Sequence, residues 1–212
     1  YNGRAIVANG TVNWTNGDLR SGNSGTFTVG SGGTFNDSAS KSISNPGFGG
    51  TSTFIINGTY NKTAAGTTAV GQFFTNTGAL NVQAGTFRLD NTSSFSAASA
   101  VAVSAAATLQ FDSTTSVADA ASLTGAGVFS LTNGTLTLAG TFSAAGGFTQ
   151  TGGILAGTQT FNTPVAWSAG TWSSSDTTTI AAANTLAISG PAAHDYNGRA
   201  IVANGTVNWT NG

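Results

Sequence analysis

One short phrase of hydrophobic and polar residues recurs along the chain: a glycine, any residue, then a large apolar residue. Examples are Gly25-Thr26-Phe27, Gly58-Thr59-Tyr60, Gly85-Thr86-Phe87 and Gly134-Thr135-Leu136. Glycine permits a sharp corner, and alternation after it predicts a strand whose apolar residue points inward while its neighbours point outward. Where the phrases cluster they fall six to eight residues apart, which is too close for ordinary hairpins. The spacing predicts one short strand on each side of a polygonal coil.

Three such strands would give a coil of roughly 21 residues and a stack of about nine coils that advances about 43 Å. The sequence therefore predicts an all-β fold, a right-handed three-sided parallel β-helix, or β-solenoid. Tandem Ig-like β-sandwiches are the alternative, and they fit less well because their turn signals fall every 8–12 residues or so. Residues 97–107 are rich in alanine, but Val101 and Val103 alternate with small residues there, which predicts a strand rather than a helix.

The first 17 residues, YNGRAIVANGTVNWTNG, return unchanged at 196–212, an offset of 195 residues. Self-similarity at a fixed spacing is typical of repeat arrays. We expect residues 1–195 to form one solenoid unit and residues 196–212 to begin the next identical unit, continuous with the first. Because the chain lacks methionine, we interpret it as part of a longer tandem protein. A shorter internal echo relates residues 26–38 to residues 177–189, and WTNGDL from Trp14 resembles WSAGTW from Trp167.

Composition narrows the class of protein. Charged residues make up 6% of the chain, against roughly a quarter in ordinary soluble domains, yet 39% of the residues are hydrophobic, which argues against disorder. The net charge is −1 and the six basic residues are scattered, so the basic stripe of a nucleic-acid binder is missing. The longest weakly polar run, residues 97–109, is shorter than the roughly 20 residues that span a bilayer. With no cysteine, disulfides and thiolate metal sites are excluded.

Phrases such as NGTVNWTNGDL, GTWSSSDTTTIAAANTLAIS and LTNGTLTLAGTF resemble the repeats of bacterial surface and secreted β-solenoid proteins of the adhesin-like and autotransporter-passenger type. This resemblance implies an extracellular fibrous protein and brings no catalytic residues with it. The chain departs from the calcium-binding nonapeptide solenoids, whose Gly-Gly-x-Gly-x-Asp motif is missing. We therefore expect no metal and no cofactor.

Candidate catalytic groups are sparse. Among the seven aspartates only Asp112 and Asp119 lie one strand length apart, as a carbohydrate-cleaving pair would need. The interpretation that both occupy turns is favoured over a catalytic pair, and we expect the protein not to be an enzyme. His194, Asp195, Tyr196 and Arg199 form the densest group of functional side chains. Following Gly190 and Pro191, they are predicted to lie in a surface loop at the junction between units, which is the candidate contact with a partner.

Outward side chains suggest two further possibilities. Threonine pairs such as Thr26/Thr28, Thr135/Thr137 and Thr177/Thr179 could order water in an ice-binding solenoid if they aligned on successive coils. The tryptophans Trp14, Trp167, Trp172 and Trp209 could form a sugar-binding platform, although their positions in the alternation favour the core. Arg88 and Asp90 lie two residues apart on one face and predict an exposed ion pair.

These observations favour a structural function. We expect an extracellular rod or filament on a bacterial cell surface that serves attachment, adhesion or matrix and sheath formation, and whose partners are further copies of its own repeat and surface glycans. A carbohydrate-active or carbohydrate-binding β-helix and an ice-binding solenoid are the alternatives.

Overall fold

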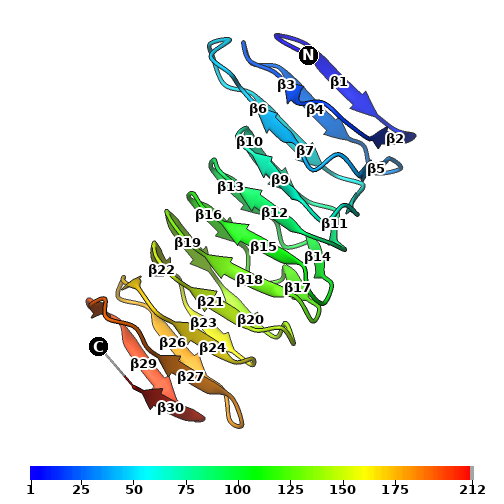
Figure 1. Ribbon diagram of the computed structural model, residues 1–212. Helices are drawn as coiled ribbons and strands as arrows, with labels where there is room; N and C mark the ends of the chain where they lie inside the picture. Colours follow the sequence, from blue (N-terminus) through cyan, green and yellow to red (C-terminus); the bar gives the residue numbers. More distant parts are fainter. Residues whose placement is uncertain (211–212) are drawn as a thin grey trace.

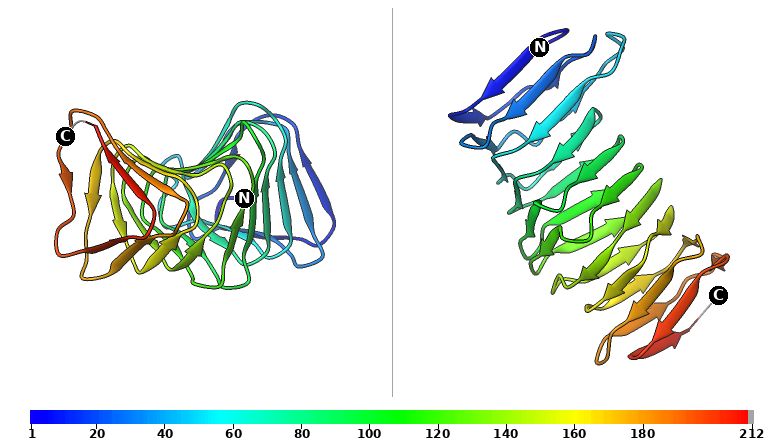
Figure 2. Two further views of the ribbon diagram at one scale, coloured as in Figure 1. Left: turned by 90° about the horizontal axis from the view of Figure 1, so that it is seen from below. Right: turned by 180° about the vertical axis from the view of Figure 1, so that it is seen from behind.

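The computed structural model describes residues 1–210, and every regular element in that range is a β-strand. The thirty strands follow one another around a three-sided path, and the strands that pair are parallel and lie three places apart in the chain. We name the three sides of the path face A, face B and face C. The chain ends lie at opposite ends of the resulting stack of ten coils (Figures 1 and 2).

Face A is one sheet of ten strands: β1 (Ala5–Ala8), β4 (Thr26–Val29), β7 (Thr53–Ile56), β10 (Phe73–Asn76), β13 (Ser93–Phe95), β16 (Thr115–Val117), β19 (Thr135–Leu138), β22 (Ile154–Ala156), β25 (Gly170–Trp172) and β28 (His194–Asp195). Face C is also one sheet: β3 (Leu19–Arg20), β6 (Ser42–Ser44), β9 (Thr67–Val70), β12 (Thr86–Leu89), β15 (Thr108–Phe111), β18 (Val128–Leu131), β21 (Phe148–Gln150), β24 (Val165–Trp167), β27 (Thr185–Ile188) and β30 (Thr206–Trp209).

Face B is divided into two sheets. The first contains β2 (Thr11–Trp14), β5 (Thr34–Asp37), β8 (Thr59–Lys62), β11 (Ala79–Val82), β14 (Ala100–Val103) and β17 (Ser122–Thr124). The second contains β20 (Gly140–Phe142), β23 (Gln159–Phe161), β26 (Thr177–Ile180) and β29 (Ala200–Ala203). The three-sided parallel β-helix is thus confirmed, and its parallel pairing excludes the antiparallel sheets of Ig-like sandwiches.

Coil length varies around the predicted value of about 21 residues. The shortest step between paired residues is 17, from Ile154 to Thr171, and the longest is 27, from Thr26 to Thr53. The long coil contains the turn at residues 45–52 between β6 and β7, where Phe48 is 39% exposed. Extra residues are therefore accommodated in the corners, while the strands keep their register.

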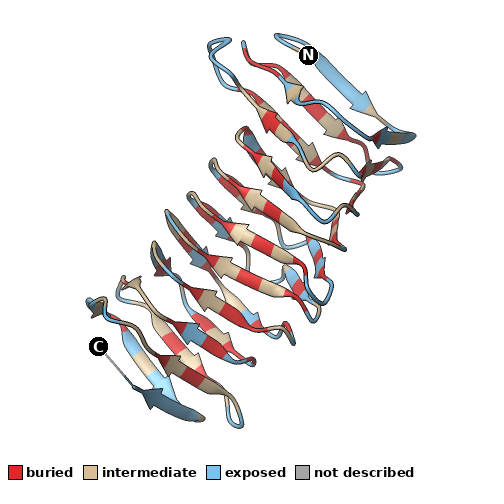
Figure 3. Cartoon of the chain, viewed as in Figure 1, coloured by how far each residue is buried: buried red, intermediate tan, exposed pale blue. Residues whose placement is uncertain are grey.

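The core runs through the interior of the stack. Along most strands every second residue is buried, as the alternating colours show (Figure 3). On face A the rings of Phe27, Phe54, Phe74 and Phe95 follow one another from coil to coil with centroids 5.4, 6.4 and 5.8 Å apart. No single coil can bury such side chains on both sides, so each coil depends on the next for its apolar contacts.

The repeated segment takes part in the same stack. Residues 196–210 continue the solenoid through β29 and β30, which pair with β26 and β27. Residues 211 and 212, the last two of the expected second unit, lie outside the described part of the chain.

Candidate functional site

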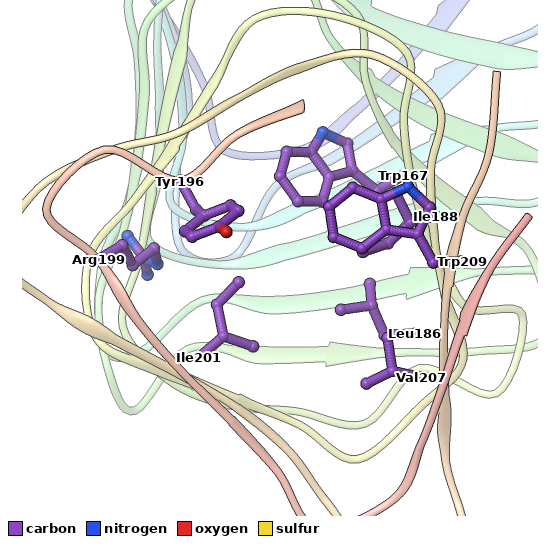
Figure 4. Close-up of a pocket in the computed structure, with 8 residues that line it drawn as sticks. All are labelled: Trp167, Leu186, Ile188, Tyr196, Arg199, Ile201, Val207 and Trp209. Atoms are coloured by element: carbon purple, nitrogen blue, oxygen red, sulfur yellow. The ribbon is translucent and has the colours of Figure 1, made fainter. Parts of the chain in front are cut away.

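The C-terminal end of the stack is an open apolar surface. A cavity of about 260 Å³ lies there, lined by Trp167, Leu186, Ile188, Tyr196, Arg199, Ile201, Val207 and Trp209 (Figure 4). In the preceding coil the corresponding inward positions, Leu186 and Ile188, are buried. Here Trp209 is 53% and Val207 43% exposed, so the last coil presents core residues without a coil above them.

An imidazole lies between two indoles at this end. His194 meets Trp167 edge-on with ring centroids 4.9 Å apart, and its centroid lies 6.3 Å from that of Trp209. Its Nε2 is 3.2 Å from the carbonyl oxygen of Trp167, while its Nδ1 is buried without a hydrogen-bond partner. The two indole contacts make the half-buried His194 part of the aromatic packing at the end of the stack.

Arg199 lies inside the coil rather than on the surface. It is 6% exposed, and its guanidinium donates hydrogen bonds to residues of the two preceding coils. The acceptors are the Thr178 hydroxyl at 2.6 Å, Gln159 Oε1 at 2.7 Å, the Ser173 carbonyl at 2.9 Å, the Ser174 hydroxyl at 3.1 Å, the Leu155 carbonyl at 3.4 Å and the Gly157 carbonyl. Burial lowers the pKa of Arg199, and the negative charge of Asp176 opposes that shift. The side chain thus ties the last coils together.

The prediction of a junction loop requires correction at two of its four residues. His194 and Asp195 form β28, which pairs with β25 on face A, whereas Tyr196 and Arg199 lie in the turn between β28 and β29. His194 is half-buried and Arg199 is buried, whereas Asp195 and Tyr196 are exposed. Of the four candidate contact residues, only these two offer their side chains to a partner at the surface. Burial of Arg199 was missed because its acceptors lie 21 to 44 residues earlier in the sequence.

The candidate acid pair does not converge. Asp112 follows β15 at the corner between faces C and A, where its carboxylate accepts a hydrogen bond from Thr132 at 2.6 Å. Asp119 follows β16 at the corner between faces A and B. The two residues therefore lie at opposite ends of one strand, in turns, as the favoured interpretation had it.

A second polar cluster is enclosed in the core. The Asp37 carboxylate accepts hydrogen bonds from the Tyr60 hydroxyl at 2.9 Å and from the Thr68 hydroxyl. Nearby, the Lys62 ammonium donates to Ser40 Oγ at 3.1 Å and to the Ala64 carbonyl at 2.7 Å. Asp37, Tyr60, Lys62 and Thr68 each have no exposed surface, so a substrate has no route to them, and the cluster satisfies interior polar groups instead.

The outer faces carry polar side chains, but the threonine pairs on face A do not repeat from coil to coil. On face B, Asn13, Asn36, Asn61 and Asn81 form a ladder in which each amide donates to the one before it, at 2.9, 3.0 and 2.9 Å. On face A, the pair Thr26/Thr28 is followed by Thr53/Ile55, and Thr135/Thr137 is followed by Ile154/Ala156. The aligned threonine pairs that the ice-binding alternative requires are therefore not continued on successive coils.

Two smaller predictions are confirmed. Arg88 and Asp90 form an ion pair, with Nε–Oδ1 at 2.5 Å and Nη2–Oδ2 at 2.8 Å. Trp14, Trp167 and Trp172 lie in the core, Trp167 stacking on Trp172 at 4.5 Å. The exposed Trp209 is the exception, because it lies on the last coil.

Within residues 1–210 no cluster of His, Cys, Asp or Glu could hold a metal ion, and no helix long and apolar enough to cross a membrane is found. Comparisons with protein-family models, with curated proteins and with solved structures find no match to this chain.

Proposed function

We propose that this chain is part of a structural extracellular repeat protein that forms a rod or filament on a bacterial cell surface, for attachment, adhesion or matrix formation. The observation that carries the proposal is that identical sequences lie in both end coils of one continuous core. At the C-terminal end Trp209 and Val207 are exposed, and at the N-terminal end Ile6 is 39% exposed although its partner Phe27 is buried. Inward-facing apolar side chains are thus exposed at both ends, which supports continuation of the stack by another coil of the same repeat.

The outer surface supports the same proposal. With 6% charged residues and a net charge of −1, the sides carry hydroxyl and amide groups such as the Asn13–Asn81 ladder. Such groups remain hydrated and can form many weak hydrogen bonds with neighbouring polymers, including surface glycans. An adhesive rod needs length and a hydrated side, and a stack of coils provides both without a catalytic site.

Electron cryo-microscopy of the full-length product on the cells that make it tests the proposal. A thin unbranched fibre with ridges about 4.8 Å apart is expected, since that is the spacing of stacked parallel strands. Cells from which the coding sequence has been deleted provide the control. Compact particles, or a product confined to the cell interior, would contradict the proposed rod.

A further inference from the structure

The two copies of the repeated segment lie on different faces of the solenoid. In the first copy Ala5–Ala8 forms β1 on face A and Thr11–Trp14 forms β2 on face B. In the second copy the same residues form β29 on face B and β30 on face C. The step from β1 to β29 is 28 strands, which is nine coils of three strands and one strand more.

The shorter internal echo shows the same displacement independently. Thr26–Val29 and Thr34–Asp37 lie on faces A and B, whereas their counterparts Thr177–Ile180 and Thr185–Ile188 lie on faces B and C. Equivalent core positions remain equivalent in burial: Val29 and Ile180 are both fully buried. One sequence pattern thus fits two neighbouring faces.

The corners are interchangeable as well. Trp14 Nε1 donates to the carbonyl of Gly17 at 2.8 Å at the corner between faces B and C. Trp167 Nε1 donates to the carbonyl of Gly170 at 3.2 Å at the corner between faces C and A. The same hydrogen bond from an indole to a glycine carbonyl therefore occurs at two different corners of the coil.

The way in which strands pair explains why the same sequence can occupy different faces. Apart from the break between β17 and β20, neighbouring strands of a sheet lie three places apart in the chain, and this holds whichever face a strand occupies. A shift by one face therefore preserves the pairing between strands three places apart. Only the packing across the interior changes, and inward positions such as Val29 on face A and its counterpart Ile180 on face B are both fully buried.

We infer that a 195-residue unit of this solenoid consists of 28 strands, so that consecutive units are displaced by one face. This inference rests on the proposed rod of tandem units. The open C-terminal end then receives a coil with the sequence of residues 18–37 of an identical unit, whose counterpart of β5 covers β30 on face C. Any outward feature of the unit, such as the turn that carries Phe48, occurs on each of the three sides once in three units. A unit advances about 45 Å, slightly more than nine full coils would.

The displacement can be tested in this chain because it contains no cysteine. Val202 lies beside Thr179 on face B, and its counterpart Val7 lies beside Thr28 on face A. If the second copy occupied the same face as the first, Val202 would instead stack on Thr171 of β25. Aligned residues on adjacent strands lie about 4.8 Å apart, within the range of Cα separations that a disulfide spans. The test uses three double variants under mild oxidation: Val7→Cys/Thr28→Cys, Thr179→Cys/Val202→Cys and Thr171→Cys/Val202→Cys.

The first two variants are expected to form the disulfide to the same extent, and the third is expected to remain reduced. A disulfide in the third variant, or none in the second while the first forms one, would overturn the displacement. The disulfide test of the displacement is independent of the microscopy test of the rod. Compact particles on the cell would contradict the proposed rod and leave the disulfide pattern unchanged.

Discussion

The indole of Trp14 meets the ring of Phe35 edge-on, with ring centroids 6.0 Å apart. Phe35 belongs to the following coil, and its contact leaves Trp14 only 6% exposed. Trp209 occupies the same position in the second copy and is 53% exposed. The difference between two identical residues thus comes from the presence or absence of one neighbouring coil.

The difference in exposure predicts that replacing Trp14 by alanine lowers the free energy of unfolding more than replacing Trp209 does. Trp14→Ala should lower the free energy of unfolding by about 3–5 kcal/mol, as buried aromatic deletions do. Trp209→Ala should cost less than about 1 kcal/mol, as at other largely exposed positions. Urea unfolding of each variant gives both values. Extending the chain after Gly212 by a further copy of residues 18–38 should raise the cost at Trp209 toward that at Trp14; an unchanged cost would mean that this coil does not cover Trp209.

Arg4 and Arg199 provide a second matched pair. Arg4 is exposed, whereas Arg199 donates hydrogen bonds to groups that include Thr178 and Gln159 in the preceding coils. Arg199→Ala leaves these buried acceptors unsatisfied and should cost about 1–3 kcal/mol, measured by urea unfolding or as faster amide exchange in β29 and β30. Arg4→Ala should stay within about 0.5 kcal/mol of the parent. The explanation is that an arginine at this position of the repeat reaches toward the coils that precede it. Equal losses of unfolding free energy in Arg199→Ala and Arg4→Ala would contradict it.

Gly10 and Gly205 also occupy equivalent positions of the repeat. A Cβ added at Gly10 would meet no atom within 4 Å, whereas one added at Gly205 would lie 2.2 Å from the carbonyl oxygen of Asn184. Gly205→Ala should therefore force the backbone of the last coils apart, at a cost of about 1–3 kcal/mol. Gly10→Ala should be neutral or slightly stabilising, by up to about 1 kcal/mol, because it restricts the unfolded chain. Thermal unfolding of the two variants in parallel checks the prediction.

The sequence was sufficient to predict the fold because its signal is local. Gly25-Thr26-Phe27 places a corner, an outward threonine and an inward phenylalanine within three residues, and strand β4 follows that order. Val101 and Val103 likewise alternate strictly, and both are buried in β14. A coil of three such strands follows from spacing alone.

Other features depend on contacts between distant residues. The guanidinium of Arg199 meets Leu155 and Gly157, more than 40 residues away, so an arginine beside His194 and Asp195 looked like a surface residue. The number of strands in a unit was equally hidden, because corners of variable length make the coils between 17 and 27 residues long. Average spacing predicted nine coils and left the additional strand out.

Asp37 and Lys62 pair in register on face B, and both are buried although each carries a charged group. Alternation along β5 and β8 correctly places them on the inward side, but it gives no reason for a charge there. The reason is the set of donors and acceptors that converge from other strands, including Tyr60 and Thr68.

The buried phenol of Tyr60 predicts a dependence of stability on alkaline pH. Burial, followed by the charge of Asp37 and the hydrogen bond to it, raises the pKa of Tyr60 well above its ordinary value of 10.0. Because the folded state then holds its proton more tightly than the unfolded chain, this contribution is fully present below about pH 10 and is lost as the pH rises further. The slope should approach about 1.4 kcal/mol per pH unit. Burial lowers the pKa of Lys62, which acts in the opposite sense, so the difference between the parent and Tyr60→Phe isolates the tyrosine.

That difference, measured by urea unfolding from pH 8 to pH 11, should be constant up to about pH 10 and then decline. At neutral pH Tyr60→Phe should cost about 1.5–3 kcal/mol, because the Asp37 carboxylate loses a hydrogen-bond donor while the stacking of the ring on Phe35 at 5.1 Å is kept. Tyr196→Phe, at a tyrosine that is 52% exposed, controls for the loss of a phenol at the surface. A difference that stays constant through pH 11 would mean that water reaches the phenol of Tyr60, and the enclosed cluster around Asp37 would have to be open to solvent.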